Sequence, residues 1–248
     1  MAPISRDDFI KRIQTVAFKS FIVNEFIDAA HFFQEIHTSM PLLQERGIKE
    51  LARAFSDEGR SVEEYWEARQ GLDGRFQYSM PRVLYWSYLI FLCGLMETKL
   101  RAIASILASH KGISLEEWLD PPKPAKKPDG SYIEKYRYFI AKNSNLDISL
   151  IAEWSFLGDL ACIRNCLVHR GGQLPAKIER RQQIRNISGR SADSIRAEPD
   201  WDHPRAKLII TEYFCQQATV KLHEFFDNLY SKLADGSIIP VLVYQHIY

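Results

Sequence analysis

Three polar side chains lie close together in residues 161–172, whose sequence is ACIRNCLVHRGG. In a helix, a spacing of four places Asn165 and His169 on one face, and the long side chain of Arg164 can reach toward them. Histidine accepts or donates a proton near neutral pH, and arginine binds anionic oxygens with planar, permanently charged donors. The segment therefore has the residue types needed for acid–base chemistry on an anionic substrate.

The same residues also have a structural interpretation. His169 would lie in the last turn of its helix, where the helix dipole favours an imidazolium, and the glycines that follow would end the helix. Arg164 would pair with a buried carboxylate, for which Glu97 is the obvious candidate because it stands in an apolar stretch. Glu97 could equally pair with Arg101 at i+4 or lie at a cleft and hold Arg164 or His169 in place. The sequence leaves these alternatives open.

The elements that must position these residues are predicted to be helices, because apolar residues recur at spacings of three and four. A capping box at Ser61 and Glu64 marks one helix start, and Pro41 is expected to begin another. We therefore expect an all-α fold with helices over residues 6–37, 40–55, 62–71, 81–110, 114–120, 131–142, 147–169 and 211–233.

Three stretches depart from this periodicity. The proline-broken residues 121–130 are predicted to form a loop, and residues 171–205 lose apolar periodicity altogether. Residues 206–210 suggest a short strand or an extended segment, and the apolar tail after residue 236 is expected to pack on the body. We divide the chain into residues 1–75, a helical extension packed on the core, and residues 76–248, the main helical domain.

The composition is that of an ordinary globular protein, with 46% hydrophobic and 25% charged residues in a chain of 248. A net charge of +1 argues against nucleic-acid binding through the overall field, although a local basic patch is compatible with it. The longest uncharged apolar run, Val83–Met96, is too short to span a bilayer, and the N-terminus has no secretory signal. Four cysteines without a CxxC pair suit reduced thiols. We therefore expect a cytoplasmic protein that does not associate with a membrane.

The segment R-N-C-L-V-H resembles the R-x4-H signature of the HEPN superfamily, in the variant with asparagine after the arginine. The resemblance covers roughly residues 80–235. It includes an apolar helix with an embedded glutamate before the motif, a glycine-bearing loop after it, and the helix around TEYFCQQATVKLHEFFDNL. The resemblance implies an antiparallel helical bundle that dimerises, so that two motif helices meet across a twofold axis and form a composite cleft.

The resemblance further implies a metal-independent endoribonuclease, in which the RNA 2′-hydroxyl attacks the adjacent phosphate. The implied catalytic residues are Arg164, Asn165, His169 and Glu97, and no cofactor is expected. The biological role implied is that of a toxin in stress response or phage defence. A non-catalytic HEPN protein that serves dimerisation or RNA or nucleotide binding is the alternative. A helical scaffold, in which Arg164 and His169 are structural, is a second one.

The partners expected are RNA and a second copy of the chain. RNA phosphates would be held by basic residues after the motif, although such runs are also common in solvated loops. The candidates are Arg170, Lys177, Arg180, Arg181 and Arg185.

Two further features bear on partners and metals. In HEPN toxins that pair with nucleotidyltransferase antitoxins, a tyrosine stands two residues after the histidine. Gly171 occupies that position here, so control through that tyrosine is not supported. The sequence leaves open whether another kind of antitoxin or a regulatory protein binds this chain. Cys162, Cys166 and His169 share one side of a helix, but no second cluster completes four ligands, so no metal site is predicted.

Overall fold

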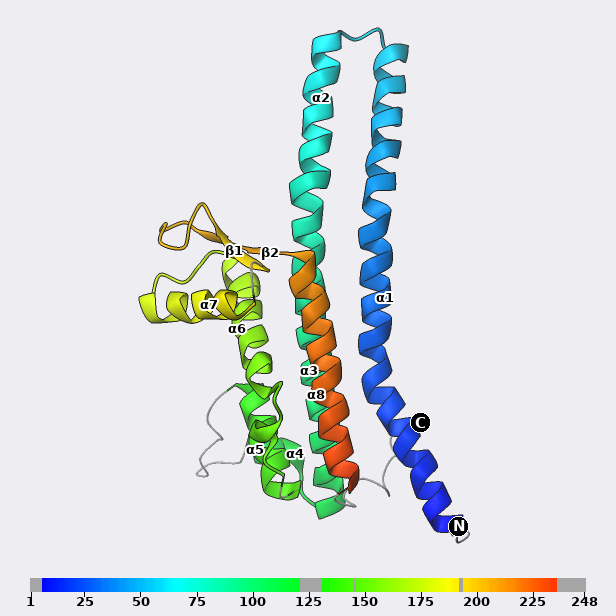
Figure 1. Ribbon diagram of the computed structural model, residues 1–248, viewed down its shortest axis with the longest axis vertical. Coiled ribbons are helices and arrows are strands. Elements are labelled where there is room, and N and C mark those ends of the chain that lie inside the picture. Colours follow the sequence, from blue (N-terminus) through cyan, green and yellow to red (C-terminus); the bar gives the residue numbers. More distant parts are fainter. Residues whose placement is uncertain (1–5, 121–130, 145, 192–193, 236–248) are drawn as a thin grey trace. The chain divides into compact units, whose positions relative to one another are not determined.

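The computed structural model describes residues 6–120, 131–144, 146–191 and 194–235 (Figure 1). This part of the chain is mostly helical, which confirms the predicted all-α class. The helices are α1 Arg6–Asp57, α2 Val62–Gly74, α3 Met80–Lys111, α4 Leu115–Leu119, α5 Tyr132–Ser144, α6 Trp154–Arg170, α7 Ile178–Arg190 and α8 Glu212–Asp235. A π-helical turn η1 (Arg75–Ser79), a 3₁₀ turn η2 (Ile148–Leu150) and strands β1 (Ile195–Glu198) and β2 (Lys207–Ile210) complete the order.

The chain forms two compact units. The first unit consists of residues up to Ile27, Phe91–Arg164 and the residues from Gln217 onward. The second unit consists of Asp28–Ile90 and Asn165–Gln216. The boundary that we predicted after residue 75 does not coincide with this division, and it stays a prediction.

The first unit is built around aromatic and aliphatic side chains of α3, α6 and α8. The rings of Phe26 and Phe226 stack at 5.4 Å, which packs α1 on α8. Trp154 of α6 lies 6.0 Å from Phe225 of α8, and its face is covered by the guanidinium of Arg137 from α5 at 5.6 Å. Burial of such large aromatic side chains is the main source of stability for a unit of this kind.

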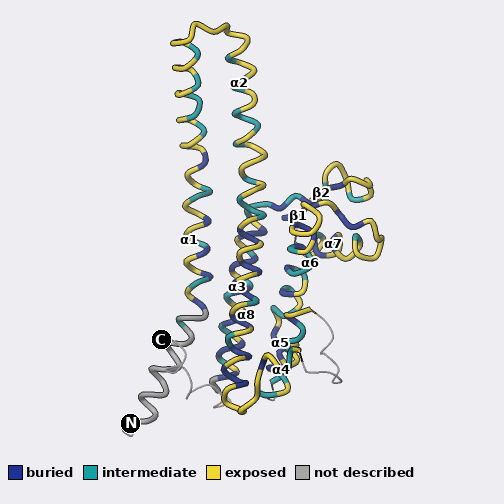
Figure 2. Tube along the Cα trace, turned by 180° about the vertical axis from the view of Figure 1, so that it is seen from behind, coloured by how far each residue is buried: buried dark blue, intermediate teal, exposed yellow. Residues whose placement is uncertain are grey.

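The second unit contains an antiparallel helical hairpin, in which α1 and α2 lie side by side (Figure 1). At its base, Phe33 stacks on Tyr88 at 4.3 Å, and His37 lies 3.3 Å from the Glu212 carboxylate. From residue 41 to residue 87 no residue is buried, as the mainly exposed colouring of this hairpin in Figure 2 shows. The buried side chains of this unit therefore come from the hairpin base and from residues 165–216.

The second unit also holds the small sheet that follows the motif. Strands β1 and β2 pair antiparallel, from Ile195 opposite Ile210 to Glu198 opposite Lys207. The chain that leaves α6 adds to this hairpin, because the Leu208 N–H donates to the Gly172 carbonyl at 2.8 Å and Gln173 forms a bridge with Lys207. The segment after α6 is thereby fixed by backbone hydrogen bonds.

Several local predictions are confirmed. The Ser61–Glu64 capping box begins α2, and the N–H of Phe214 reaches the Thr211 hydroxyl at the start of α8. Gly112, with φ of +65°, ends α3 as the sequence indicated, and the Ile113 N–H donates to the Ala108 carbonyl. Residues 207–210 form a strand, one of the two alternatives that the sequence left open.

Two predictions of local structure are wrong. Pro41 does not begin a helix but lies inside α1, and the part of α1 after the proline is held by contacts with α2: the Gln44 amide donates to the Asp73 carboxylate at 2.8 Å, and the Phe55 and Tyr65 rings lie 5.9 Å apart. Residues 178–190, predicted to be irregular, form α7. Its apolar signal is weak, because only Ile184 and Ile187 are buried and most of its other residues are exposed and polar.

Three further outcomes concern helix ends and the remaining segments. Gly71 does not end α2, which continues to Gly74, and α6 begins at Trp154 rather than near residue 147. The predicted loop 121–130 and the apolar tail lie outside the described residues. Within the described residues, no helix has both the length and the apolar character that crossing a membrane requires.

Candidate functional site

The end of α6 is closed by backbone groups rather than by a side chain. Gly171 and Gly172 follow the helix with φ of +56° and +77°, a region that glycine adopts without the strain other residues incur. The Gly172 N–H donates to the Cys166 carbonyl at 3.2 Å, and the Gln173 N–H donates to the Arg170 carbonyl at 3.0 Å. The structure therefore needs no capping contribution from the His169 ring.

Gly172 is also confined by its neighbour. A Cβ atom at this position would lie 2.5 Å from Cη2 and 2.6 Å from Cζ2 of the Trp86 ring. The buried Trp86 indole nitrogen has no hydrogen-bond partner in the described part of the chain, and the Arg82 guanidinium lies 5.6 Å from the ring centre. The chain after the motif is therefore held closely against α3 within the second unit.

His169 and Asn165 are both exposed on the last turns of α6. Across the described residues, no group hydrogen-bonds or forms an ion pair with the His169 imidazole. One helical turn separates the two side chains, so that they share a face of α6. This part of the motif is accessible to an external ligand.

Arg164, the last residue of the first unit, is half-buried. Its charge acts on the Cys93 thiol of α3, which also contacts the Leu160 carbonyl at 3.8 Å. Burial raises the pKa of Cys93 to about 12, while Arg164 lowers it and Glu97 raises it further. Arg164 and Glu97 therefore lie in the same region of the first unit, on either side of one buried thiol.

Glu97 does not lie on the motif side of that thiol. In the first unit α3 and α6 run antiparallel (Figure 1). The step of one turn from Cys93 to Glu97 therefore leads away from the end of α6 that carries Arg164. Glu97 is half-buried and lines a groove formed by α3, α4 and α5 instead. Its predicted role beside Arg164 stays untested, and this direction does not favour it.

Arg101, the alternative partner of Glu97, is engaged elsewhere. Its guanidinium lies 3.3 Å from the Glu116 carboxylate of α4, and both side chains are largely exposed. Within the described residues, no hydrogen bond or ion pair reaches the Glu97 carboxylate. The sequence suggested Arg101 or Arg164 as the partner of the Glu97 carboxylate. In the structure, neither guanidinium forms an ion pair with it.

The predicted RNA-binding residues differ in their surroundings. Arg170, Lys177 and Arg180 are exposed. Arg181 is half-buried and donates to the backbone carbonyls of residues 175, 201, 202 and 203 at 3.1–3.3 Å. Arg185 lies 3.6 Å from the Asp202 carboxylate. Arg181 therefore has a structural function that the sequence did not reveal, because backbone acceptors leave no pattern in residue type.

The first-unit part of α6 presents small residues to solvent. Ser155 and Gly158 are exposed, and Cys162 is half-buried. A Cβ atom at Gly158 would meet no atom within 4 Å. Helices approach closely where such small side chains lie, so this face has the shape for a second helix.

Sequence reasoning did not detect the groove beside Glu97. Its aromatic wall, Tyr132 and Tyr136, has a helical spacing of four that could have indicated a shared face.

Within the described residues, no cluster of three histidine, cysteine, aspartate or glutamate side chains has a metal-binding arrangement. Comparison of the chain with models of known families, with curated proteins and with solved structures finds no match in any of the three.

Proposed function

We propose that the protein is a metal-independent endoribonuclease of the HEPN type that acts as a homodimer. The observation that carries this proposal is the accessibility of His169 at the end of α6, where backbone groups of Gly172 and Gln173 already close the helix. Because the imidazole is exposed and unengaged by the described residues, its placement on the same face of α6 as Asn165 is better explained by a substrate than by a cap.

The chemistry follows from the residue types. In the proposed reaction the RNA 2′-oxygen attacks the adjacent phosphorus, the bond to the 5′-oxygen breaks, and a 2′,3′-cyclic phosphate and a 5′-hydroxyl result. One imidazole removes the proton from the 2′-hydroxyl, and another donates a proton to the leaving 5′-oxygen. In a dimer, the two copies of His169 supply both groups. Arg164 would stabilise the charge on the phosphate oxygens, and Asn165 would orient His169 or donate to phosphate.

Features of each unit support a dimer with RNA bound near the motif. The exposed small residues Ser155 and Gly158 allow another copy of α6 to approach closely. In the second unit, Arg170 and Arg180 are exposed cations that phosphates can reach. A toxin-like role in stress response or phage defence, exerted in the cytoplasm, is part of the same proposal.

The test is RNA cleavage by purified protein with and without EDTA. Cleavage should persist in EDTA and leave cyclic phosphate ends, and His169→Ala should lower the rate about 10²–10⁴-fold. His110→Ala is the matched control, because His110 also lies exposed in the last turn of a helix, α3, that a glycine of positive φ ends. Its cleavage rate should equal that of the unaltered protein.

Other outcomes decide against the proposal. A strict requirement for magnesium, or equal losses in the His169 and His110 variants, would refute the mechanism. RNA binding without any cleavage would favour the non-catalytic alternative. Unfolding of both Arg164→Ala and His169→Ala would favour the scaffold, and a monomer at tens of micromolar in light scattering would exclude the composite cleft.

A further inference from the structure

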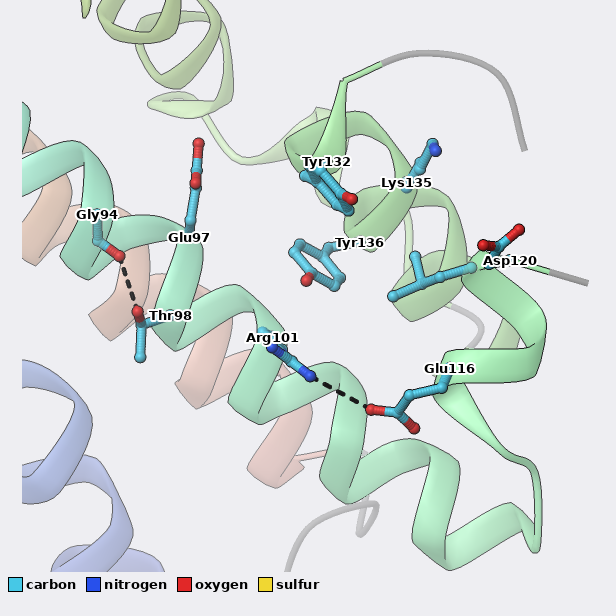
Figure 3. A pocket seen from close by; sticks show the side chains of 10 residues that line it. Gly94, Glu97, Thr98, Arg101, Glu116, Asp120, Tyr132, Lys135 and Tyr136 are labelled. Carbon is cyan, nitrogen blue, oxygen red and sulfur yellow. Dashed lines mark hydrogen bonds and ion pairs between the residues drawn. The ribbon is translucent and has the colours of Figure 1, made fainter. Parts of the chain in front are cut away.

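A groove in the first unit has the features of a small-molecule site. It lies between α3, α4 and α5 and encloses about 610 Å³ (Figure 3). This volume is within the range of sites that hold small ligands, roughly 300–1,000 Å³. All of the residues that line it belong to the first unit, and neither Arg164 nor His169 is among them.

Tyr136 forms the inner wall of the groove and is the first indication of a ligand. Only 5% of this residue is exposed, and its hydroxyl, which no described residue contacts through a hydrogen bond, is open to the groove rather than fully buried. Figure 3 shows the hydroxyl pointing toward α3, on the side from which Glu97 and Arg101 project. Burial raises the pKa of Tyr136, Arg101 opposes this rise, and Tyr132 and Glu97 add to it, so these groups surround the hydroxyl. A buried tyrosine usually directs its hydroxyl to a partner, and here the groove is where that partner can lie.

Glu97 gives the second indication. Its half-buried carboxylate projects from α3 at the groove and receives no hydrogen bond or ion pair from the described residues. A half-buried carboxylate that no described residue contacts can accept hydrogen bonds from a ligand, and an ammonium group is the ligand fragment of complementary charge. The exposed ring of Tyr132, 61% accessible, offers an aromatic face beside it.

Two cationic side chains, Arg101 and Lys135, also line the groove, so a ligand there can carry an anionic group as well. Among the described residues, the Arg101 guanidinium contacts the Glu116 carboxylate at 3.3 Å, and both side chains are largely exposed. The Lys135 ammonium lies 5.3 Å from the centre of the Tyr132 ring. Glu97 and Arg101 are one turn apart on α3, a separation of about 5–6 Å between Cβ atoms. Figure 3 shows the Glu97 carboxylate pointing away from the Arg101 guanidinium, which turns toward Glu116, so the groove offers an anion and a cation at separate points of its lining.

We propose that this groove binds a free amino acid as its zwitterion, with an aromatic or large apolar side chain. The ammonium contacts Glu97 and the Tyr136 hydroxyl, the carboxylate contacts Arg101 or Lys135, and the side chain lies on Tyr132. A polyamine would meet like charge at Arg101 and Lys135. A phosphate compound would meet like charge at Glu97 and Glu116. A zwitterion satisfies both signs.

The experiment is calorimetric titration of the full chain with L-phenylalanine, in the absence of RNA. Saturable binding with a Kd of about 1 mM or below is expected. N-acetyl-L-phenylalanine and L-phenylalanine amide, which each lack one charge, should bind at least about tenfold more weakly because each loses one charge-assisted contact. An absence of saturation up to about 10 mM, or equal binding by the N-acetyl compound, would overturn the proposal.

Variants test the assigned contacts. Glu97→Gln should weaken L-phenylalanine binding about tenfold or more, whereas Glu117→Gln, an exposed carboxylate of α4 outside the groove, should not change it. Tyr136→Phe keeps the ring and removes the unpartnered hydroxyl, so it should weaken binding about tenfold while the free energy of unfolding without ligand stays equal or rises. Unchanged affinity in Tyr136→Phe, or a loss of stability in that variant, contradicts the role given to the hydroxyl. Because RNA is absent from these measurements, their failure would leave the proposed ribonuclease untouched, and the reverse also holds.

Discussion

Two adjacent glycines after the motif allow backbone strain to be separated from a steric clash. Gly171 and Gly172 both have positive φ, but only a Cβ atom at Gly172 would meet another residue, the Trp86 ring at 2.5 Å. Placing alanine in the left-handed region costs about 1–2 kcal/mol, and the loss of chain entropy in the unfolded state returns about 0.4–1 kcal/mol. Gly171→Ala should therefore lower the free energy of unfolding by about 0–1.6 kcal/mol.

Gly172→Ala carries the same backbone cost and adds the clash with Trp86. Overpacking a buried site typically costs a further 1–3 kcal/mol or so. The expected total is about 1–4.6 kcal/mol, because the new Cβ would lie 2.5 Å from the Trp86 ring and one of the two must shift. Urea unfolding followed by far-UV circular dichroism measures both variants, and the comparison is valid where the slopes with denaturant agree.

A third variant identifies the cause. Trp86→Leu removes the ring atoms that the new Cβ would meet, so Gly172→Ala should cost less in that background than in the natural chain. The coupling free energy of this double-mutant cycle should be on the order of 1–3 kcal/mol. Equal destabilisation by Gly171→Ala and Gly172→Ala, or a coupling near zero, would refute the inferred contact between the chain after α6 and the Trp86 ring.

Two further predictions concern the basic segment and the buried thiol. Arg180→Gln should weaken RNA binding and reduce its salt dependence with little change in stability, whereas Arg181→Gln, which removes donors to four backbone carbonyls, should lower the midpoint of thermal unfolding. Filter binding measures the first effect and thermal melting the second. If Arg180→Gln lowered the melting midpoint and Arg181→Gln weakened RNA binding instead, the roles given to these two residues would be wrong. Burial raises the pKa of Cys93 from 9.0 to about 12, so the folded chain keeps a proton that the unfolded chain releases, and stability should decline as pH rises above about 9. Cys93→Ala should remove part of this alkaline decline, up to about 1.4 kcal/mol per pH unit, and an unchanged pH profile in that variant would count against the buried thiol as its source.

The sequence predicted those elements whose local signals and tertiary contacts agree. The helices α3 and α8 have long apolar stripes, and α2 has a capping box that needs no tertiary support. The break expected before Pro41 was wrong because contacts with α2, such as the Gln44–Asp73 hydrogen bond, hold the part of α1 that follows the proline, and these are tertiary contacts. Residues 178–190 were missed because two buried isoleucines are too few for a periodic signal.

The candidate site was predictable only in part, for a related reason. Residue type and spacing located Arg164, Asn165 and His169 on one helix and its end at the glycines. They could not show that Glu97 extends from α3 in the direction away from Arg164, because the antiparallel course of the two helices in the first unit is a tertiary property. The position of Tyr136 in the groove, likewise, depends on how α5 faces α3 and not on any motif.

The difference between Arg181 and His169 is what links the structure to the proposed function. Both are polar residues of the second unit, His169 in the last turn of α6 and Arg181 in α7, and from the sequence each could have been structural or functional. Arg181 is satisfied by backbone carbonyls at 3.1–3.3 Å, so the fold itself accounts for its presence. His169 is exposed, and no hydrogen bond or ion pair ties it to the described part of the chain. A residue that the fold uses destabilises the protein when it is replaced, whereas a residue that the fold does not use changes only what the protein binds or converts. Measuring stability and cleavage side by side for Arg181→Gln and His169→Ala therefore separates the two roles, and loss of stability without loss of cleavage in the His169 variant would show that its exposure has been misinterpreted.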